Sequence, residues 1–184
     1  GQRYRNTAED LAKLDQKYCA ELGRFSFKET DTCHSFFGRF SPLSNHFQSK
    51  MEIDGLVYSN VEQYYYCAKA REHGDVALER KLLTVNNPVE VKQMGRKLGD
   101  TRAWNSAKRS IMQRGVMEKF KQNEEAKKYL LRTGERVIGE ASPHDRFWGT
   151  GFGLRHEMSL DPGSWVGENA LGKVLMEVRR QLRG

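Results

Sequence analysis

The sequence predicts a mainly helical α+β fold, a single compact domain with a small β-sheet or hairpin. Beyond residue 60, apolar residues recur at helical spacing, and residues that favour helix starts separate the helical stretches. Short runs that favour strands are concentrated before residue 60 and around residues 135–142. A chain of 184 residues, 38% of them hydrophobic, is long enough to bury one core.

Residues 1–23 are predicted to form an N-terminal helical arm, and residues 24–184 the domain itself. Apolar residues spaced for one face of a helix lie between residues 7 and 22, namely Leu11, Leu14, Tyr18 and Leu22. In the domain, RFSFKE at residues 24–29 alternates like a short strand. Asp54-Gly55 between two short apolar runs predicts a tight hairpin turn, and ERVIGEAS at residues 135–142 predicts a further strand.

The remaining elements are predicted to be helices. A helix over residues 60–72 would face the core with Val61, Tyr64, Tyr65 and Ala68. Later helix starts are predicted at three asparagines, with a stop at Gly99: Asn87 followed by Pro88, Asn105, and Asn123. The last helix carries its apolar face at Leu171, Val174, Leu175, Val178 and Leu182.

The positive charge is unevenly placed. The net charge is +7, and residues 101–136 alone hold ten Lys or Arg against four Glu. A basic stretch attracts the phosphates of nucleic acid, of a nucleotide or of another anionic metabolite. The alternative is a solvated helix face that keeps the protein soluble, and charge alone favours neither interpretation.

Cysteine usage favours a reducing compartment. Cys19, Cys33 and Cys67 are odd in number and have no CxxC or Cys/His ligand spacing, so neither a disulfide framework nor a zinc site is indicated. No stretch approaches the ~18 apolar residues of a membrane span, and no signal segment opens the chain. We expect a monomer without metal, cofactor or membrane partner, in the cytoplasm or alternatively the nucleus.

Two loops, GRFSPLSN and HDRFWGTGFG, combine glycine with aromatic and polar residues, as expected where a base is stacked and a phosphate is bound. Walker, GxGxxG, HExxH and nucleophile-elbow patterns are all missing from the sequence, which disfavours the chemistry of those motifs. What remains is carboxylates beside aromatic residues. This set suits cleavage of a glycosidic bond, in which a carboxylate stabilises an oxocarbenium-like centre or activates water.

Glu62 and Lys69 share a flank of the predicted 60–72 helix, two turns or about 10.5 Å apart, too far for an ordinary ion pair. Each candidate also has a structural interpretation. Ser59 and Glu62 match a capping box, in which Glu62 would only bond the helix start. Lys69 would be a solvated lysine, and Trp104 and Trp148 would be core anchors. Asp145 would cap a turn, and the glycines at 149, 151 and 153 would only permit a bend.

The order of several motifs resembles the NADAR superfamily, also called YbiA-like proteins. These motifs are FGRFSPLSNHF, DGLVYSNVEQYYYCAKA, RKLGDTRAWN, DRFWGTGFG and GENALGKVLMEVR, and the resemblance covers roughly residues 36–182. It implies a compact, mainly helical N-glycosidase that acts on ribosylated bases. Some members resemble enzymes that cleave phosphorylated intermediates of riboflavin synthesis, and others remove ADP-ribose from guanine in nucleic acid.

By this resemblance, four residues match the family's active site, and Lys69 matches a lysine of that site: Glu62, Trp104, Asp145 and Trp148. We expect Glu62 to stabilise the C1 centre or activate water, and Asp145 to polarise a ribose hydroxyl or handle the proton, with the two roles interchangeable. Trp104 and Trp148 would stack on a ring. Lys69 could bind the ribose as a charge or form a Schiff base. Weaker candidates for substrate contacts are Arg39, Ser41, Ser44, Asn45, Lys97, Gly149 and Gly151.

One departure from the family bears on the substrate. Riboflavin-type members carry a Pro-Tyr-Gly segment before Phe-Ser-Asn-Phe, whereas this chain has FFGRFSPLSNHF, with His46 before Phe47. We therefore favour ADP-ribosylated guanosine, in a nucleotide, DNA or RNA, over a riboflavin intermediate or a related phosphorylated N-riboside. The alternative from another class is a non-catalytic reader that binds ADP-ribose or a nucleotide.

Overall fold

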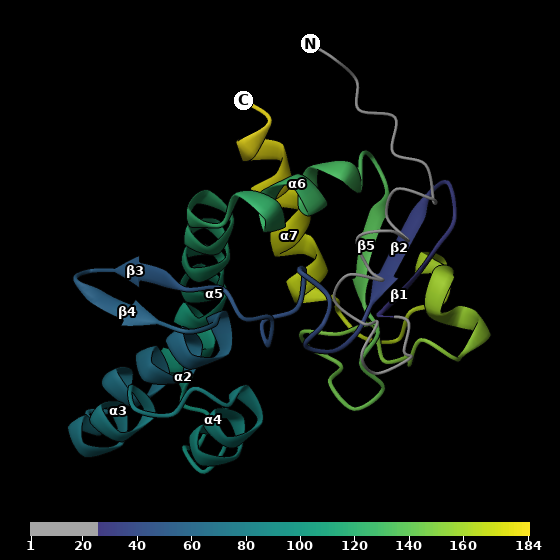
Figure 1. Cartoon of the computed structure of the whole chain (residues 1–184). Helices are drawn as coiled ribbons and strands as arrows, with labels where there is room; N and C mark the ends of the chain where they lie inside the picture. The colour runs from purple at the N-terminus through teal and green to yellow at the C-terminus, as the bar shows by residue number, and fades with distance from the viewer. Residues whose placement is uncertain (1–25) are drawn as a thin grey trace. The chain divides into compact units, whose positions relative to one another are not determined.

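The computed structural model describes residues 26–184, so the helical arm predicted at residues 1–23 lies outside the described residues. The described chain divides into two units (Figure 1). One unit comprises the residues up to Ser44 together with Glu124–Gly184, and the other comprises Asn45–Asn123. Each unit is described by itself below. In residues 26–184, no helix is both long and apolar enough to cross a membrane.

The first unit is built on a three-stranded sheet in the order β1-β2-β5. Strand β1 (Phe27–Glu29) is antiparallel to β2 (Cys33–Phe36), and β2 is parallel to β5 (Val137–Glu140). All four residues of β2 are buried, so it lacks the alternation that would have revealed it in the sequence. The strands predicted at residues 24–29 and 135–142 are confirmed, with shorter bounds.

Two α-helices and two short 3-10 helices complete this unit. They are α6 (Glu124–Arg132), η1 (Glu157–Leu160), η2 (Pro162–Ser164) and α7 (Ala170–Leu182). Helix α7 packs against β5, and its predicted apolar face is buried at Leu171, Val174, Leu175 and Val178. The final helix of the prediction is therefore confirmed.

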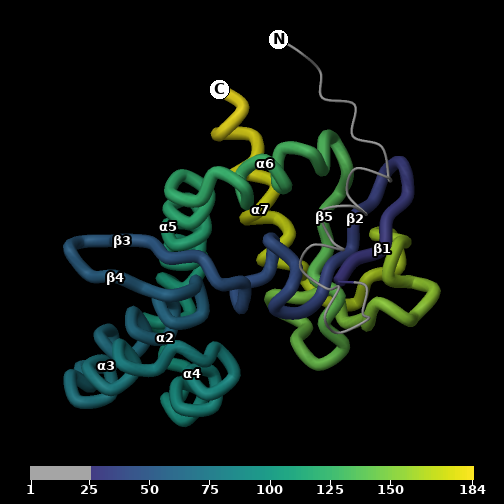
Figure 2. Tube along the Cα trace, viewed as in Figure 1, coloured from purple at the N-terminus to yellow at the C-terminus, as the bar shows by residue number. Residues whose placement is uncertain are grey.

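The second unit contains a hairpin and four helices, and Figure 2 traces its chain. Strands β3 (Met51–Ile53) and β4 (Leu56–Tyr58) pair around Asp54 and Gly55. Both turn residues have positive φ, 53° and 79°, which is the conformation of the predicted tight turn. The helices are α2 (Val61–Glu72), α3 (Val76–Leu82), α4 (Pro88–Gly95) and α5 (Arg102–Gln122).

Helix α2 is the centre of this unit, because α3, α4 and α5 all pack against it (Figure 1). The single core stripe predicted for α2 understates its burial. Nearly the whole helix is buried, including Glu62, Tyr66 and Lys69 on the predicted flank, whereas Ala68 of the predicted stripe is only half-buried. Neighbouring helices on several sides leave little of its surface to solvent, which a one-sided pattern cannot represent.

Three consecutive tyrosines fix α2 to its neighbours. A Cβ atom added at Gly115 of α5 would lie 2.4 Å from the Tyr64 ring, and one at Gly95 of α4 would lie 2.1 Å from the Tyr66 ring. The Tyr65 ring meets Trp104 of α5 with centroids 5.1 Å apart. Two rings therefore lie directly over glycine backbone, and no larger residue fits there without movement.

Side-chain caps decide where these helices begin, and two of the predicted helix boundaries were wrong. Asn87 caps α4 through Val89 N–H at 3.0 Å, as predicted, but α4 ends at Gly95 rather than Gly99. Helix α5 begins at Arg102 instead of after Asn105, because the Thr101 hydroxyl accepts the Trp104 N–H at 3.0 Å one turn earlier. Helix α6 does start directly after Asn123, and α3 was not predicted.

A lysine lies in the core of the second unit. Lys119 of α5 is 1% exposed, and its ammonium group lies 5.6 Å from the Phe47 ring centroid and 4.9 Å from that of Phe120. Burial lowers the pKa of Lys119 from 10.5 to about 7. At a pH between these two pKa values, Lys119 therefore carries a proton in the unfolded chain but not in the folded protein.

The glycine positions beneath the tyrosines predict a steric effect. Gly95→Ala and Gly115→Ala should each lower the free energy of unfolding by about 1–3 kcal/mol, because a ring must leave its position. For Gly115, the loss should exceed the ~1 kcal/mol that alanine gains over glycine inside a helix. Urea denaturation measures the free energy of unfolding of each variant. Gly99→Ala is the control, since nothing lies within 4 Å of its added Cβ; equal stability of all three variants would refute the steric role.

The buried lysine predicts a pH dependence of stability. Between pH 7 and 9, the Lys119 contribution should make the folded protein more stable as pH rises, because only the unfolded chain keeps that proton. Lys119→Met should stabilise the protein at pH 7, on the order of a few kcal/mol, and reduce this slope. Urea denaturation at several pH values tests it, with exposed Lys121→Met as the control. Identical slopes for wild type and Lys119→Met would contradict the prediction.

Candidate functional site

The predicted site residues are distributed over both units. Those in the second unit are Asn45, Glu62, Lys69, Lys97 and Trp104, and those in the first are Arg39, Ser41, Ser44, Asp145, Trp148, Gly149 and Gly151. The structure describes contacts within each set. That the two sets form one site stays a prediction.

Glu62 does not cap its helix. The cap is formed by Asn60, whose side-chain oxygen accepts the Gln63 N–H at 2.9 Å, while the Gln63 side chain accepts the Ser59 N–H at 2.7 Å. The capping box suggested for Ser59 and Glu62 is therefore wrong by one residue, because Asn60 and Gln63 supply the reciprocal bonds. The carboxylate of Glu62 is not used to begin α2.

Glu62 is instead paired with a histidine. Its Oε2 atom lies 3.3 Å from Nε2 of His46, and the two side chains are 10% and 24% exposed. The Glu62 backbone N–H donates to the Asn45 carbonyl at 3.1 Å, which ties the chain before His46 to the first turn of α2. A nearly buried carboxylate thus lies next to a more exposed imidazole.

Lys69, two turns along α2, has its own counter-ion. Its ammonium group donates to Asp100 Oδ1 at 2.8 Å and lies 5.8 Å from the Trp104 ring centroid. The Lys69 side chain is 7% exposed and that of Asp100 is 62% exposed. The hydrogen bond from Lys69 lowers the pKa of Asp100, so this carboxylate is ionised at neutral pH. Sequence analysis missed Asp100, because no periodic pattern links two residues 31 positions apart.

His73 links the end of α2 to the turn that carries Asp100. Its Nδ1 atom lies 2.9 Å from the Lys69 carbonyl oxygen, and Nε2 lies 2.6 Å from the Gly99 carbonyl oxygen. The imidazole ring therefore bridges two backbone carbonyl groups that lie 30 positions apart in the chain. Lys69 and Asp100 are thereby fixed through backbone as well as through side chains.

The other predicted residues of this unit differ in accessibility. Trp104 is 1% exposed, which supports the core-anchor interpretation, and its stacking on a substrate ring stays a prediction. The Asn45 side-chain amide donates to the Met112 sulfur at 3.4 Å, so it points towards α5. Lys97 is exposed.

In the first unit, Asp145 caps a turn. Its Oδ1 atom accepts the N–H groups of Phe147 at 3.0 Å and Trp148 at 2.8 Å, which is the turn-cap alternative. The Trp148 ring is half-buried and meets Phe147 edge-on at 4.7 Å. Trp148 therefore keeps an accessible surface, whereas the catalytic role of Asp145 stays a prediction.

The remaining candidates have visible structural roles. A Cβ atom at Gly149 would lie 2.7 Å from the Asp145 carbonyl oxygen, and Gly151 has a φ of 87°, so the loop requires glycine at both positions. Ser41 and Ser44 are buried. Arg39 is exposed, with its guanidinium group 4.9 Å from the Phe40 ring centroid.

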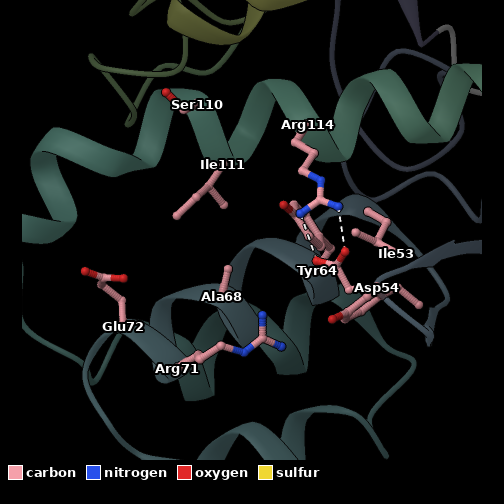
Figure 3. A pocket seen from close by; sticks show the side chains of 10 residues that line it. Ile53, Asp54, Tyr64, Ala68, Arg71, Glu72, Ser110, Ile111 and Arg114 are labelled. Atoms are coloured by element: carbon pink, nitrogen blue, oxygen red, sulfur yellow. Dashed lines mark hydrogen bonds and ion pairs between the residues drawn. The ribbon is translucent and has the colours of Figure 1, made fainter.

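A surface cavity of about 300 Å³ lies beside α2, and neither Glu62 nor Lys69 belongs to its lining (Figure 3). Its lining comes from the hairpin, α2 and α5, and includes none of the predicted site residues. At its rim, Arg114 binds Asp54 through two hydrogen bonds of 2.8 and 2.7 Å. Arg71 binds Glu79 at 2.6 Å. Both guanidinium groups are thus neutralised, and the charges favour no ligand class.

Residues 26–184 contain no group of three or more His, Cys, Asp or Glu side chains that could hold a metal ion. The candidate residues of the second unit include an acid and a base on α2, Glu62 and Lys69. A paired carboxylate at the start of α2 can stabilise positive charge or activate water. A lysine near the end of the same helix can bind a hydroxyl or phosphate group.

Comparison with known proteins gives a consistent result. Residues 25–183 match the sequence model of the NADAR domain family. N-glycosidase R617 of Acanthamoeba polyphaga mimivirus is 35% identical over 126 residues, which cover 67% of this chain and 74% of that protein. The NMR structure of the E. coli protein YbiA matches with a TM-score of 0.69 at 27% identity, covering 87% of this chain and 90% of the YbiA chain.

A further relative has a different name. Riboflavin biosynthesis protein VVA0006 of Vibrio vulnificus is 30% identical over 159 residues, which cover 85% of this chain but only 38% of that protein. More than half of that relative therefore lies outside the matched region. Its name can describe a part of the protein that this chain does not share.

Proposed function

This chain belongs to the NADAR domain family, and on that premise we propose that it removes ADP-ribose from ADP-ribosylated guanosine by hydrolysing the bond between ribose and base. The predicted family, the mainly helical α+β fold and the hydrolase class are confirmed by the family match, the fold of YbiA and the relatives named N-glycosidases. The substrate is the part of this proposal that goes beyond them.

The observation that carries the proposal is the position of Glu62. Its carboxylate is nearly buried, takes no part in the helix cap and lies 3.3 Å from His46. Cleavage of an N-glycosidic bond develops positive charge at C1 of the ribose. A carboxylate held in a poorly hydrated place stabilises that charge more strongly than one in water, or activates the water that attacks it.

Lys69 serves the substrate as a charged group in this proposal. Its ammonium group donates to Asp100 and can also donate to a ribose hydroxyl or a phosphate oxygen. The covalent role, in which Lys69 forms a Schiff base with the opened ribose, requires loss of a proton from this ammonium group. The ionised Asp100 carboxylate lies 2.8 Å from the nitrogen that carries this proton.

The preference for guanosine linked to ADP-ribose rests on one loop, and the charge of α5 is compatible with it. The chain has no Pro-Tyr-Gly segment of the riboflavin type in FFGRFSPLSNHF. Helix α5 also exposes basic side chains that suit a phosphate backbone: Arg102, Arg109 and Lys121. Asp145 and Trp148 complete the proposed chemistry, the first by handling a proton and the second by stacking on a base.

A second candidate substrate is a phosphorylated intermediate of riboflavin synthesis, favoured by the name of the Vibrio vulnificus relative. The basic face accepts its phosphate as well as that of a nucleotide. The two candidates share the bond type and differ in the leaving group. A reader without catalysis would bind ADP-ribose and leave both substrates intact.

The substrate is tested by incubating the protein with an oligonucleotide that carries ADP-ribosylated guanosine and, separately, with a phosphorylated riboflavin-pathway N-riboside. Mass spectrometry of the products should show an unmodified strand and free ADP-ribose in the first reaction. Cleavage of the N-riboside alone would replace the proposed substrate with the second candidate. Binding of ADP-ribose without cleavage of either substrate would identify a reader.

Glu62→Gln should lower the cleavage rate by on the order of 10²- to 10⁴-fold, because glutamine keeps the shape but loses the charge and the basic oxygen. Folding should be unchanged, since the cap of α2 is made by Asn60 and Gln63. Single-turnover rates together with the thermal midpoint check both statements. A folded Glu62→Gln variant with wild-type activity would remove Glu62 from the mechanism.

A further inference from the structure

The contact between His46 and Glu62 is a local feature of the second unit. The two residues lie 16 positions apart, and the chain between them forms the hairpin and returns to the start of α2. The bond from Glu62 N–H to the Asn45 carbonyl at 3.1 Å holds the backbone on both sides of the contact. The His46 side chain therefore faces Glu62 because main chain, and not only side chain, is fixed there.

The Glu62 side chain is less exposed than that of His46. Glu62 is 10% exposed, and His46 is 24% exposed. The carboxylate is thus the more enclosed member of the pair, and the imidazole is the more accessible one. A contact at 3.3 Å restricts the rotation of the Glu62 side chain, so His46 limits the positions that the carboxylate can take.

We propose that His46 is a positioning residue for Glu62, holding its carboxylate correctly oriented towards the reacting ribose. This inference rests on the proposed function, because it assigns His46 a role in the same reaction. His46 does not touch the substrate in this role. Its Nε2 atom orients the Glu62 carboxylate, and the carboxylate stabilises C1 or activates the attacking water.

Removal of the nitrogens should therefore affect the rate more than binding. His46→Phe keeps a ring of similar size but loses the group that faces Glu62. We expect kcat to fall on the order of tenfold to a hundredfold with little change in KM, because the carboxylate loses its fixed orientation. His46→Gln, whose amide can still donate to Glu62, should keep most of the activity.

A double-mutant cycle separates this role from a general structural one. If His46 acts only through Glu62, His46→Phe should have no further effect on kcat in the Glu62→Gln background. The exposed Glu90 of α4 supplies the matched control, since Glu90→Gln should leave the full effect of His46→Phe in place. The thermal midpoint of every variant shows whether it is folded.

The outcomes are distinct. Wild-type activity of a folded His46→Phe variant would overturn the inference and leave the proposed function intact. Equal losses for His46→Phe in the wild-type and Glu62→Gln backgrounds would also overturn it, by showing that His46 acts independently of Glu62. A wild-type protein that cleaves neither the ADP-ribosylated oligonucleotide nor the phosphorylated N-riboside would overturn the proposed function, and the role of His46 with it.

Discussion

The close packing of tyrosines on glycines is the constraint on which the second unit depends. The Tyr64 and Tyr66 rings occupy positions that any Cβ atom on Gly115 or Gly95 would enter. Rings of this size bury a large apolar area, and glycine lets helix backbones approach them closely. Because Tyr65 also meets Trp104, one short segment of α2 fixes two neighbouring helices. The rotation of α2 about its axis is thereby determined.

That rotation decides where Glu62 and Lys69 point. The two residues share a flank of α2, and neither can turn away without moving three tyrosines. Each charge has a separate partner, His46 for Glu62 and Asp100 for Lys69. The helix adds to this arrangement, since an acid in the first turn and a base in the last turn both interact favourably with its dipole.

Local patterns predicted the elements whose signal is itself local. The Asp54-Gly55 hairpin, the Asn87 cap and the apolar face of α7 were all correct, because each depends on residues within a few positions. Strand β2 and helix α3 were missed. All of β2 is buried, so it has no alternation to recognise, and only Leu82 of α3 is buried, so it has no apolar stripe.

The residues of the candidate site also divide into those that local spacing predicted and those that it missed. Glu62 and Lys69 were placed on one flank of α2 from spacing alone, and the structure agrees with that placement. Asp100 and His46 could not be assigned from spacing, because their contacts arise from the return of the chain after a turn or a hairpin. The suggested capping box failed because two polar residues in sequence, Ser59 and Asn60, can both begin a helix.

The two ends of α2 are consequently held by different means. At the start, the Asn60 side chain and the Asn45 carbonyl accept the N–H groups of Gln63 and Glu62, which a helix leaves unpaired, and the Gln63 side chain accepts the N–H of Ser59 before the helix. At the end, His73 binds the Lys69 carbonyl and reaches the Gly99 carbonyl beside Asp100. Other side chains and one backbone carbonyl thus bind the helix ends, and the carboxylate of Glu62 and the ammonium group of Lys69 contact their counter-ions instead. A helix that used its first acid as a cap could not present that acid for catalysis.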